Sequence, residues 1–174
     1  MERRIAVIAV SVALCSPALA QDQVSVPELK KLDRYLGTWT YDGEDKTPVT
    51  GGRVTCRASR RSISGGSFVE SHRDCKTPHG DVTQLEVFGY DFRHRVYLYW
   101  GFNGRSVSTY TAASMDGDTV IWTGIDLSAG NRCTEVFASD AASSSDKCET
   151  SRGGGDSWVL RAEGKSTKLP QIAR

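Results

Sequence analysis

The feature that most constrains the fold is a series of nine short strand-like segments with no helix between them. From residue 38 onward the chain is rich in Thr, Val, Tyr, Trp and Ser, and Gly, Asn or Asp interrupts it about every ten residues. Asn103-Gly104, Asp116-Gly117 and Gly130-Asn131 are dipeptides typical of β-hairpin turns. Successive hairpins without crossover helices predict an antiparallel, up-and-down sheet. We expect strands at 38–43, 53–59, 67–75, 82–89, 95–102, 105–114, 119–127, 132–139 and 157–163.

One of these segments has bulky side chains on both faces, which a half-exposed strand does not need. In 96–102, VYLYWGF, the even-numbered residues are apolar and share one face, and both odd-numbered aromatic residues are tyrosines on the other face. Closing the sheet into a barrel removes its free edges and explains the pattern, because one face packs the interior or a ligand while the other carries a helix and loops. We therefore predict an all-β, antiparallel, up-and-down barrel of about nine strands.

A single short helix is expected before the barrel, at 26–36. Ser25 and Glu28 form a capping box, Pro27 occupies the first turn, and Gly37 ends the helix. Its three leucines lie on one face, so it should pack across the barrel. The expected organisation is one domain at 21–164, with the helix at 26–36 and the barrel at 37–164. A polar mobile loop is expected at 138–147 and a loose tail at 165–174.

The N-terminus has the pattern of a cleaved signal peptide, residues 1–20. Arg3 and Arg4 precede an apolar stretch at 5–15, and small residues of the A-x-A kind lead to a cleavage site after Ala20. The apolar stretch is shorter than the about 20 residues that a membrane-spanning helix requires. The sequence therefore predicts an exported protein, periplasmic or secreted, with no transmembrane segment after cleavage.

The charge pattern argues against two classes of partner. The chain has 22 Lys and Arg against 21 Asp and Glu, and removal of residues 1–20 leaves 20 of each sign. No basic stripe is present. Nucleic acids and anionic membrane surfaces are therefore not expected as partners.

The cysteine pattern predicts two disulfides. Cys15 lies in the predicted signal peptide, which leaves four cysteines in an exported chain. Three pairings are possible, and we favour Cys56–Cys75 with Cys133–Cys148, each closing a short loop worth about 3 kcal/mol. A zinc site is disfavoured because no C-x-x-C pair occurs.

Three stretches resemble a known family. LGTWTYDGE (36–44), SGGSFVESH (64–72) and FGYDFRHRVYLYWGFNGRS (88–106) are similar to the bacterial DUF1579 family, a calycin-like group of unknown function. The resemblance covers about 27–124. It departs from the family where Gly101-Phe102-Asn103 replace an acidic residue that often follows the tryptophan. The resemblance implies a lipocalin-like barrel in which Trp39 lies at the closed end. It also implies a stacking arginine near the last strand, for which Arg161 is the candidate.

The strongest candidate for catalysis is FVESHRDC, residues 68–75. In an extended strand Phe68, Glu70 and His72 share one face. If Phe68 points into the barrel, Glu70 and His72 enter the lumen, where burial could tune them for proton transfer. If Val69 points inward instead, these polar residues are solvated. The sequence leaves the choice open and favours a surface role.

Cofactors and metals are not expected. His72, His79 and His94 form no H-x-H or H-x-x-x-H pair, and no histidine lies late in the chain, where haem-binding calycin-like barrels carry theirs. The chain also lacks a G-x-S-x-G nucleophile motif.

The sequence supports three functional hypotheses. The first is a binding module for a small, partly apolar ligand, because small barrels enclose one small cavity. The alternatives are an isomerase, cyclase or hydrolase that uses Glu70 and His72, and an interaction protein of the envelope. The candidate ligand-binding residues are Phe68, Trp100, Tyr110 and Trp122.

Overall fold

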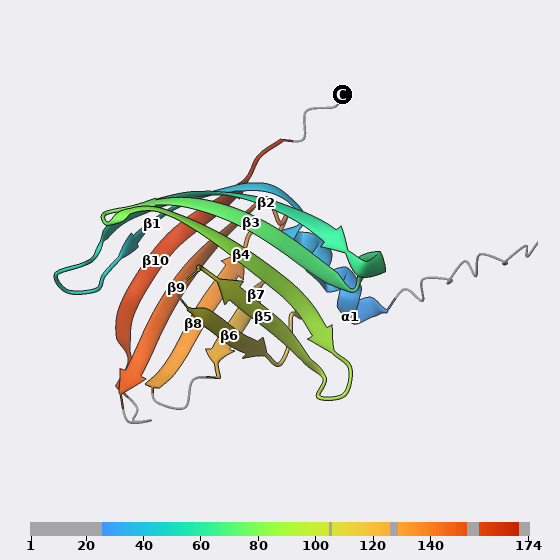
Figure 1. Ribbon diagram of the computed structural model, residues 1–174. Coiled ribbons are helices and arrows are strands. Elements are labelled where there is room, and N and C mark those ends of the chain that lie inside the picture. The colour runs from blue at the N-terminus through green and yellow to red at the C-terminus, as the bar shows by residue number, and fades with distance from the viewer. Residues whose placement is uncertain (1–25, 105, 126–128, 153–156, 171–174) are drawn as a thin grey trace, which may run out of the picture.

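The protein is a closed antiparallel barrel of ten strands with a short helical segment across one end (Figure 1). The computed structural model describes residues 26–104, 106–125, 129–152 and 157–170, so the predicted signal peptide lies outside the described residues. Each strand pairs with the next along the chain, and the last pairs with the first. The predicted fold is confirmed. The strands are β1 Gly37–Asp45, β2 Gly52–Ile63, β3 Phe68–Thr77, β4 Gly80–Asp91, β5 Val96–Phe102, β6 Val107–Ala112, β7 Thr119–Gly124, β8 Ala129–Phe137, β9 Ser143–Arg152 and β10 Val159–Lys168.

Two predictions about irregular segments are wrong. The second half of the expected mobile loop at 138–147 is strand, because β9 begins at Ser143 and pairs with β8 and β10. The expected loose tail at 165–174 begins too early, since β10 continues to Lys168, which lies opposite Trp39 of β1. The first segment is rich in Ser and Ala, and the second begins with Lys-Ser-Thr-Lys. Their order comes from backbone pairing on both sides in a closed sheet, which side-chain composition does not report.

The predicted helix is present, but most of it is a 3₁₀-helix and not an α-helix. One α-helical turn, α1 (Pro27–Lys30), continues as the 3₁₀-helix η1 (Lys31–Tyr35). Val26 is the N-cap residue and makes no side-chain capping bond, and Ser25 lies outside the described residues. In a 3₁₀-helix side chains three residues apart are aligned. Leu32 and Tyr35 therefore both point into the barrel, and each is 1% exposed.

This helical segment closes one end of the barrel. Arg34 donates hydrogen bonds to the carbonyl oxygens of Met115 (3.0 Å) and Gly117 (3.2 Å) in the connection between β6 and β7. The Trp39 indole donates to the Tyr35 carbonyl at 2.9 Å. The core gathers beneath this end and consists of Leu32, Tyr35, Trp39, Ala58, Val69, Phe88, Tyr97, Ala112, Met115, Val120, Trp122 and Phe137.

The motif residue Asp91 shapes the turn between β4 and β5. Its Oδ1 accepts the backbone N–H groups of Arg93 (2.8 Å) and His94 (3.1 Å). Its Oδ2 contacts His94 Nδ1 at 2.7 Å. An aspartate that binds the backbone two and three residues ahead stabilises a turn. Asp91 therefore has a structural role in this turn.

The barrel wall is least regular between β6 and β7. In the described residues their ladder joins Tyr110 to Gly124 and Thr111 to Thr123. The only further backbone bond between this pair of segments runs from Ile125 N–H to the Thr109 carbonyl at 3.0 Å. In the described residues, the first two residues of β6, Val107 and Ser108, therefore pair with β5 and not with β7.

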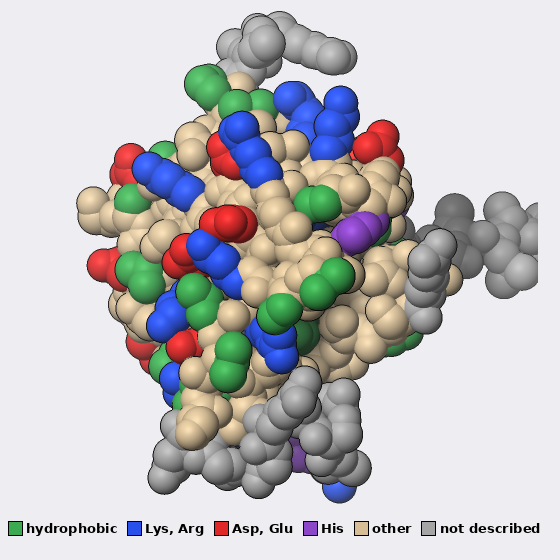
Figure 2. Space-filling model, turned by 90° about the vertical axis from the view of Figure 1, so that its left-hand side faces the viewer, with side chains coloured by type: hydrophobic (Ala, Val, Ile, Leu, Met, Phe, Trp, Pro, Cys, Tyr) green, Lys and Arg blue, Asp and Glu red, His purple; other side chains and the backbone are tan. Residues whose placement is uncertain are grey.

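The outer surface carries mixed charge. Figure 2 shows basic and acidic side chains interspersed over one face, with small apolar side chains between them. This distribution agrees with the balanced composition of the chain. Within the described residues, the helices are too short and too polar to cross a membrane.

Candidate ligand-binding site

Burial along β3 shows which residues face the lumen. The odd-numbered positions 69, 71 and 75 are buried, with exposures of 2%, 0% and 7%. The even-numbered positions 68–74 therefore point outward, since successive strand residues alternate between faces. Val69 lies opposite Phe88 of β4, and Phe88 lies opposite Tyr99 of β5. Tyr99, and with it Tyr97 two residues before, therefore also point into the barrel.

The lumen encloses a cavity of about 550 Å³. It extends from Tyr35, under the helical segment, to Asp45, Thr77 and Asn103 at the strand ends on the opposite side. Its lining combines charged groups with aromatic rings. The charged residues are Asp45, Arg60, Arg73, Glu86, Glu135 and Asp146, and the aromatic residues are Tyr35, Tyr41, Phe88, Tyr99, Tyr110 and Trp122.

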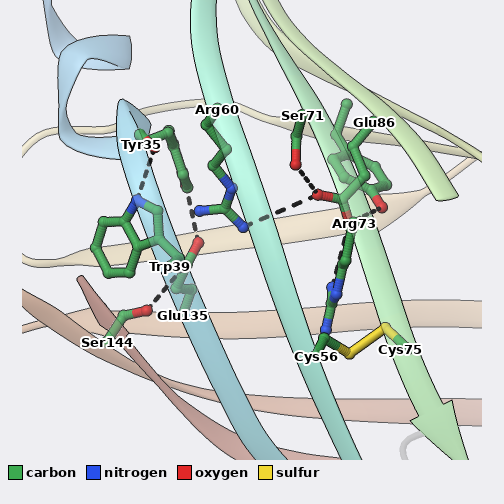
Figure 3. Close-up of polar contacts among 11 residues, drawn as sticks. Tyr35, Trp39, Cys56, Arg60, Ser71, Arg73, Cys75, Glu86, Glu135 and Ser144 are labelled. Carbon is green, nitrogen blue, oxygen red and sulfur yellow. Dashed lines mark hydrogen bonds and ion pairs between the residues drawn. A yellow bond between two sulfur atoms is a disulfide. The ribbon is translucent and has the colours of Figure 1, made fainter. Parts of the chain in front are cut away.

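Glu86 of β4 is the centre of a saturated polar network (Figure 3). Ser71 Oγ donates to its Oε2 at 2.8 Å. Arg73 Nη1 and the Tyr99 hydroxyl both donate to its Oε1 at 3.2 Å. Glu86 is 1% exposed, so these partners replace the water that the carboxylate has lost.

The network keeps Glu86 ionised. Burial alone would raise the pKa of its carboxyl group, but the positive charges of Arg73 and Arg60 and the hydrogen bonds outweigh that effect and lower the pKa. The reciprocal effect acts on the guanidinium of Arg73. Burial lowers its pKa and Glu86 raises it, with a net increase. The pair is therefore a fixed buried ion pair at neutral pH.

Arg60 of β2 is buried with much less hydrogen bonding. Its side chain is 10% exposed, and its one ion pair in the described residues is a long contact of 3.9 Å from Nη2 to Glu86 Oε2. Its Nε is buried without a hydrogen-bond partner. The guanidinium carbon instead lies 5.5–5.6 Å from the ring centres of Tyr35, Trp39 and Phe88. Cation–π contacts hold the group in place while leaving donor capacity unused.

Glu135 of β8 is held by neutral donors. The Tyr35 hydroxyl donates to its Oε2 at 2.8 Å, and Ser144 Oγ donates to its Oε1 at 3.0 Å (Figure 3). Burial and the charge of Glu135 raise the pKa of the Tyr35 phenol well above its ordinary value. Tyr35 therefore stays a hydrogen-bond donor at any physiological pH.

Asp146 of β9 lies directly opposite Glu135 in the sheet, on the lumen side. Burial and the neighbouring Glu135 raise the pKa of Asp146 to about 6, although Arg73 and a hydrogen bond from Tyr41 act against them. Burial and Asp146 raise the pKa of Tyr41 to about 12. Across the described ranges, neither Glu135 nor Asp146 forms an ion pair with Lys or Arg.

Both predicted disulfides form, and both face the cavity. Cys56–Cys75 joins β2 to β3, and Cys133–Cys148 joins β8 to β9. In each bond the two cysteines are directly opposite, with Cα atoms 4.0 Å apart. The bonds therefore tie together the strand pairs that carry the charged groups.

The proposed catalytic pair does not enter the lumen. Glu70 and His72 lie on the outer face of β3, where Glu70 binds Arg61 at 2.8 Å and His72 Nε2 at 3.0 Å. Arg61 and His72 lower the pKa of Glu70. Of the two placements that the sequence left open, the favoured one, with Glu70 and His72 on the solvated face, is observed, because Val69, the smaller apolar neighbour, takes the inward position. The alternative of a catalytic Glu70–His72 pair in the lumen is therefore wrong.

The four candidate ligand-binding residues divide between the two faces. Tyr110 and Trp122 line the cavity as predicted, and their binding role stays a prediction. Phe68 and Trp100 lie on the outer face, so their placement in the lumen is wrong. The Phe68 ring covers Gly89, and a Cβ atom there would lie 2.6 Å from the ring. Because Gly89 exposes backbone, an aromatic ring packs over it outside the barrel.

Trp39 occupies the closed end as expected, but with different cations. Lys168 Nζ lies 5.0 Å from the centre of its ring and Arg60 Cζ lies 5.5 Å away. Arg161, the predicted partner, instead donates from Nε to Thr150 Oγ1 at 2.8 Å. The irregular register between Leu160 and Ala162 interrupts the alternation of β10 at Arg161.

The histidines are dispersed. His72 contacts Glu70, His94 contacts Asp91, and His79 Nε2 lies 2.7 Å from the Thr50 carbonyl oxygen. Within the described residues, no group of three or more His, Cys, Asp or Glu side chains is placed to hold a metal ion.

Sequence reasoning missed the six charged residues that line the cavity, which are Asp45, Arg60, Arg73, Glu86, Glu135 and Asp146. A usable signal was present in β3. Val69, Ser71 and Cys75 are small or apolar and share one face, whereas the opposite face carries two acids and a histidine. The first set is the better inward face, since charged groups are rarely buried without partners. Correct assignment of β3 would also have placed Arg73 inside.

The fold and cavity define a calycin-like barrel with a polar and aromatic lumen. No protein-family model matches the chain, and no curated protein matches it by sequence. Among solved structures, the chain is similar to the S-type phycobiliprotein lyase CPES from Guillardia theta, with a TM-score of 0.59 and 10% identity. The match covers 82% of this chain and 93% of that chain. At this identity the likeness shows a shared fold.

Proposed function

We propose that this protein is an exported barrel that binds one small, partly apolar ligand in its lumen. The observation that carries the proposal is the cavity of about 550 Å³. Typical small-molecule sites occupy about 300–1,000 Å³ and combine apolar walls with a few placed polar groups. The lumen has this composition, with Trp122 and Tyr110 beside the charged residues.

The arrangement of the lining suggests how such a ligand lies. Arg60 and Glu135 lie in the half nearer the helical segment, where Arg60 contacts the Tyr35 ring and Glu135 accepts the Tyr35 hydroxyl. Val54, Val82 and the two disulfides line the other half, with Asp45 at its rim. A polar group directed toward Tyr35 and an apolar part directed toward the opposite rim match both halves.

Binding of a neutral fluorescent probe tests the proposal. N-phenyl-1-naphthylamine is uncharged at pH 7.5 and increases its emission in apolar surroundings. We expect saturable binding at one site per chain with a dissociation constant below about 10 µM. No saturable increase in emission would exclude a ligand-accepting lumen.

Filling the lumen provides a matched pair of variants. Ala162→Trp adds a large ring to the cavity wall and should weaken probe binding at least about tenfold. Val136→Trp adds the same ring on the outer face of β8, where Val136 is 42% exposed, and should bind as the wild type does. Ser108→Trp is a second lumen-filling variant if Ala162→Trp does not fold.

Export is supported by two features of the chain. The N-terminal pattern is that of a signal peptide, and two disulfides are characteristic of oxidising compartments. Expression with the native N-terminus in a bacterial host should yield protein outside the cytoplasm that begins at Gln21. N-terminal sequencing of that fraction checks the cleavage site, and retention of Met1 would contradict export.

Membership of the DUF1579 family is proposed on the same basis as before, the three sequence stretches. In the structure, Trp39 fills the closed end and Asp91 organises the β4–β5 turn. These positions support shared architecture around the motif residues. The proposed family membership therefore concerns the fold and implies no activity.

A further inference from the structure

The acidic residues Glu135 and Asp146 form a partly buried pair that makes no ion pair with Lys or Arg within the described residues. They occupy directly opposed positions on β8 and β9 and both line the cavity. Like charges directly opposite each other destabilise a sheet. Glu86, the fully buried carboxylate of the lumen, has Arg73 at 3.2 Å. The hydrogen bonds to Glu135 and Asp146 come instead from the neutral donors Tyr35, Ser144 and Tyr41, and the charge of Arg73 only partly offsets the raised pKa of Asp146.

A second, independent feature of the same cavity also points to a ligand. Arg60 is nine-tenths buried, and its Nε has no hydrogen-bond partner. That nitrogen is closed off from the cavity, but the Arg60 side chain lines the cavity, and its Nη groups, with one long contact of 3.9 Å to Glu86, can donate to an oxygen acceptor. Arg60 and Glu135 flank one side chain, because Arg60 lies 5.6 Å from the Tyr35 ring centre and Glu135 binds its hydroxyl.

From these two features we propose that the ligand is a cationic amine, whose ammonium group binds Glu135 and Asp146 while an adjacent oxygen accepts a hydrogen bond from Arg60. The inference deepens the proposed function and depends on it. An ammonium group has three N–H donors, which suit carboxylate oxygens on two neighbouring strands. Such charge-assisted hydrogen bonds are about twice as strong as neutral ones.

The aromatic lining suits the same cation. Trp122 lies opposite Cys133 in the sheet, two positions along β8 from Glu135. Its ring contacts Phe88 and Tyr99, and no cation is recorded over it in the described part of the chain. By contrast, the Trp39 ring already faces Lys168 and Arg60, and the Tyr41 ring faces Arg73. Trp122 therefore lines the cavity near the acidic pair without a cation–π partner among the described residues, and a ligand cation can make that contact.

The charge balance of the cavity favours an amine over a carboxylic acid. Its lining contains two arginines and four carboxylates, a formal excess of two negative charges. A ligand carboxylate would increase this excess. An amine reduces it, and a single neighbouring oxygen is sufficient for Arg60.

Competition between ligands with the same chain tests the proposal. Dodecylamine and dodecanoate each displace N-phenyl-1-naphthylamine at pH 7.5, below their aggregation limits, and the displacement gives a dissociation constant. We expect dodecylamine to bind at least about tenfold more tightly than dodecanoate. Equal binding, or tighter binding of dodecanoate, would overturn the proposal.

Two variants assign the preference to the acidic pair. Asp146→Asn and Glu135→Gln should each reduce the ratio of dodecylamine to dodecanoate affinity at least about fivefold. Glu149→Gln removes a carboxylate from the outer face of the same strand, where it pairs with Arg132 and Lys147, and should keep the wild-type ratio. A preference for dodecylamine that survives both lumen variants would contradict this site.

The role of Arg60 has its own probe. 1-Amino-2-dodecanol keeps the primary amine and the twelve-carbon chain of dodecylamine and adds a hydroxyl oxygen next to the amine. We expect it to bind about three- to tenfold more tightly than dodecylamine. Equal affinity would overturn the acceptor part of the proposal.

Failure of the proposed function is distinguishable from failure of this inference. If N-phenyl-1-naphthylamine does not bind the wild-type protein, the lumen accepts no ligand and both proposals fail. If the probe binds and dodecanoate competes best, the binding function stands and the amine proposal fails.

Discussion

Two opposite walls of the same lumen differ in how their charged side chains are compensated. The balanced wall, formed by β2, β3 and β4, carries Arg60, Arg73 and Glu86. The acidic wall, formed by β8 and β9, carries Glu135 and Asp146. Each wall has one disulfide between directly opposed cysteines. The covalent frameworks are alike, so the difference between the walls lies in their charges.

The difference separates residues that hold the fold from residues available to a ligand. In the balanced wall, Glu86 accepts bonds from Ser71, Arg73 and Tyr99. In the acidic wall, Asp146 is forced toward its protonated form by burial and by Glu135. A pKa shift of this kind, in a cavity, is typical of a functional site. Four predictions test the comparison.

The largest effect should follow reduction of both disulfides. Their cysteines are 19 and 15 residues apart in sequence, and each bond should contribute about 3 kcal/mol to the free energy of unfolding. Urea unfolding followed by tryptophan fluorescence, with and without dithiothreitol, measures the loss. The paired serine variants of each disulfide show whether both walls lose stability equally. Unchanged unfolding in reductant would show that neither bond supports the barrel.

The next largest effect should come from breaking the balanced wall. Glu86→Ala leaves the buried guanidinium of Arg73 without its partner and should cost about 3–5 kcal/mol of unfolding free energy. Glu70→Gln removes a carboxylate from the outer face and is the matched control, with a much smaller expected effect. Similar losses in the two variants would mean that the Glu86 network is not the stabilising element.

In the acidic wall, removal of a charge should increase the free energy of unfolding, whereas in the balanced wall it should decrease it. Because the folded-state pKa of Asp146 is raised from 3.8 to about 6, the folded state binds this proton more tightly than the unfolded state does. Its contribution therefore becomes unfavourable as pH rises from about 4 to 6, and the full penalty, at most about 3 kcal/mol, is present above about pH 6.

Asp146→Asn tests this sign. The variant should raise the unfolding free energy by about 1–3 kcal/mol at pH 7.5 and have little effect at pH 4, where the wild-type group is protonated. Unfolding curves at the two pH values provide the measurement. Destabilisation at pH 7.5 would mean that the ionised carboxylate is compensated within the protein, and the contrast between the walls would be lost.

The smallest effect is expected at the closed end. Lys168 lies over the Trp39 ring, and burial and Arg60 lower the pKa of its ammonium group. Lys168→Met should cost about 0.5–1 kcal/mol, because the lost cation–π contact is partly offset by relief of repulsion with Arg60. Chemical denaturation at pH 7.5 can detect this change. A loss as large as that of Glu86→Ala would assign Lys168 to the same stabilising network.

The architecture could be predicted because it depends on local signals. Turn dipeptides at 103–104 and 116–117 mark the ends of hairpins, and the chain between them has no room for crossover helices. β9 and the end of β10 were missed because Ser- and Lys-rich segments have weak strand propensity. Their pairing partners lie in other parts of the chain, and Lys168 pairs with Trp39.

The site was harder to predict because a shift of one residue reverses every side chain in a strand. Trp122 and Tyr110 were placed correctly, but Phe68 and Trp100 were given the wrong face. Buried charges are also poorly visible in sequence. Arg60 and Glu86 are 26 positions apart and meet only because β2, β3 and β4 lie side by side.

The pairing of consecutive cysteines has a consequence for assembly of the barrel. Each disulfide joins strands that are neighbours in sequence, whereas closure of the sheet requires β1 and β10 to meet, as at Trp39 and Lys168. The entropic cost of bringing two positions together increases with their separation along the chain. We therefore expect the two hairpins to oxidise independently of each other, and without exchange of partners, before the first and last strands join. A protein delivered across a membrane from its N-terminus would already have its first disulfide hairpin complete while its final strand was still in transit.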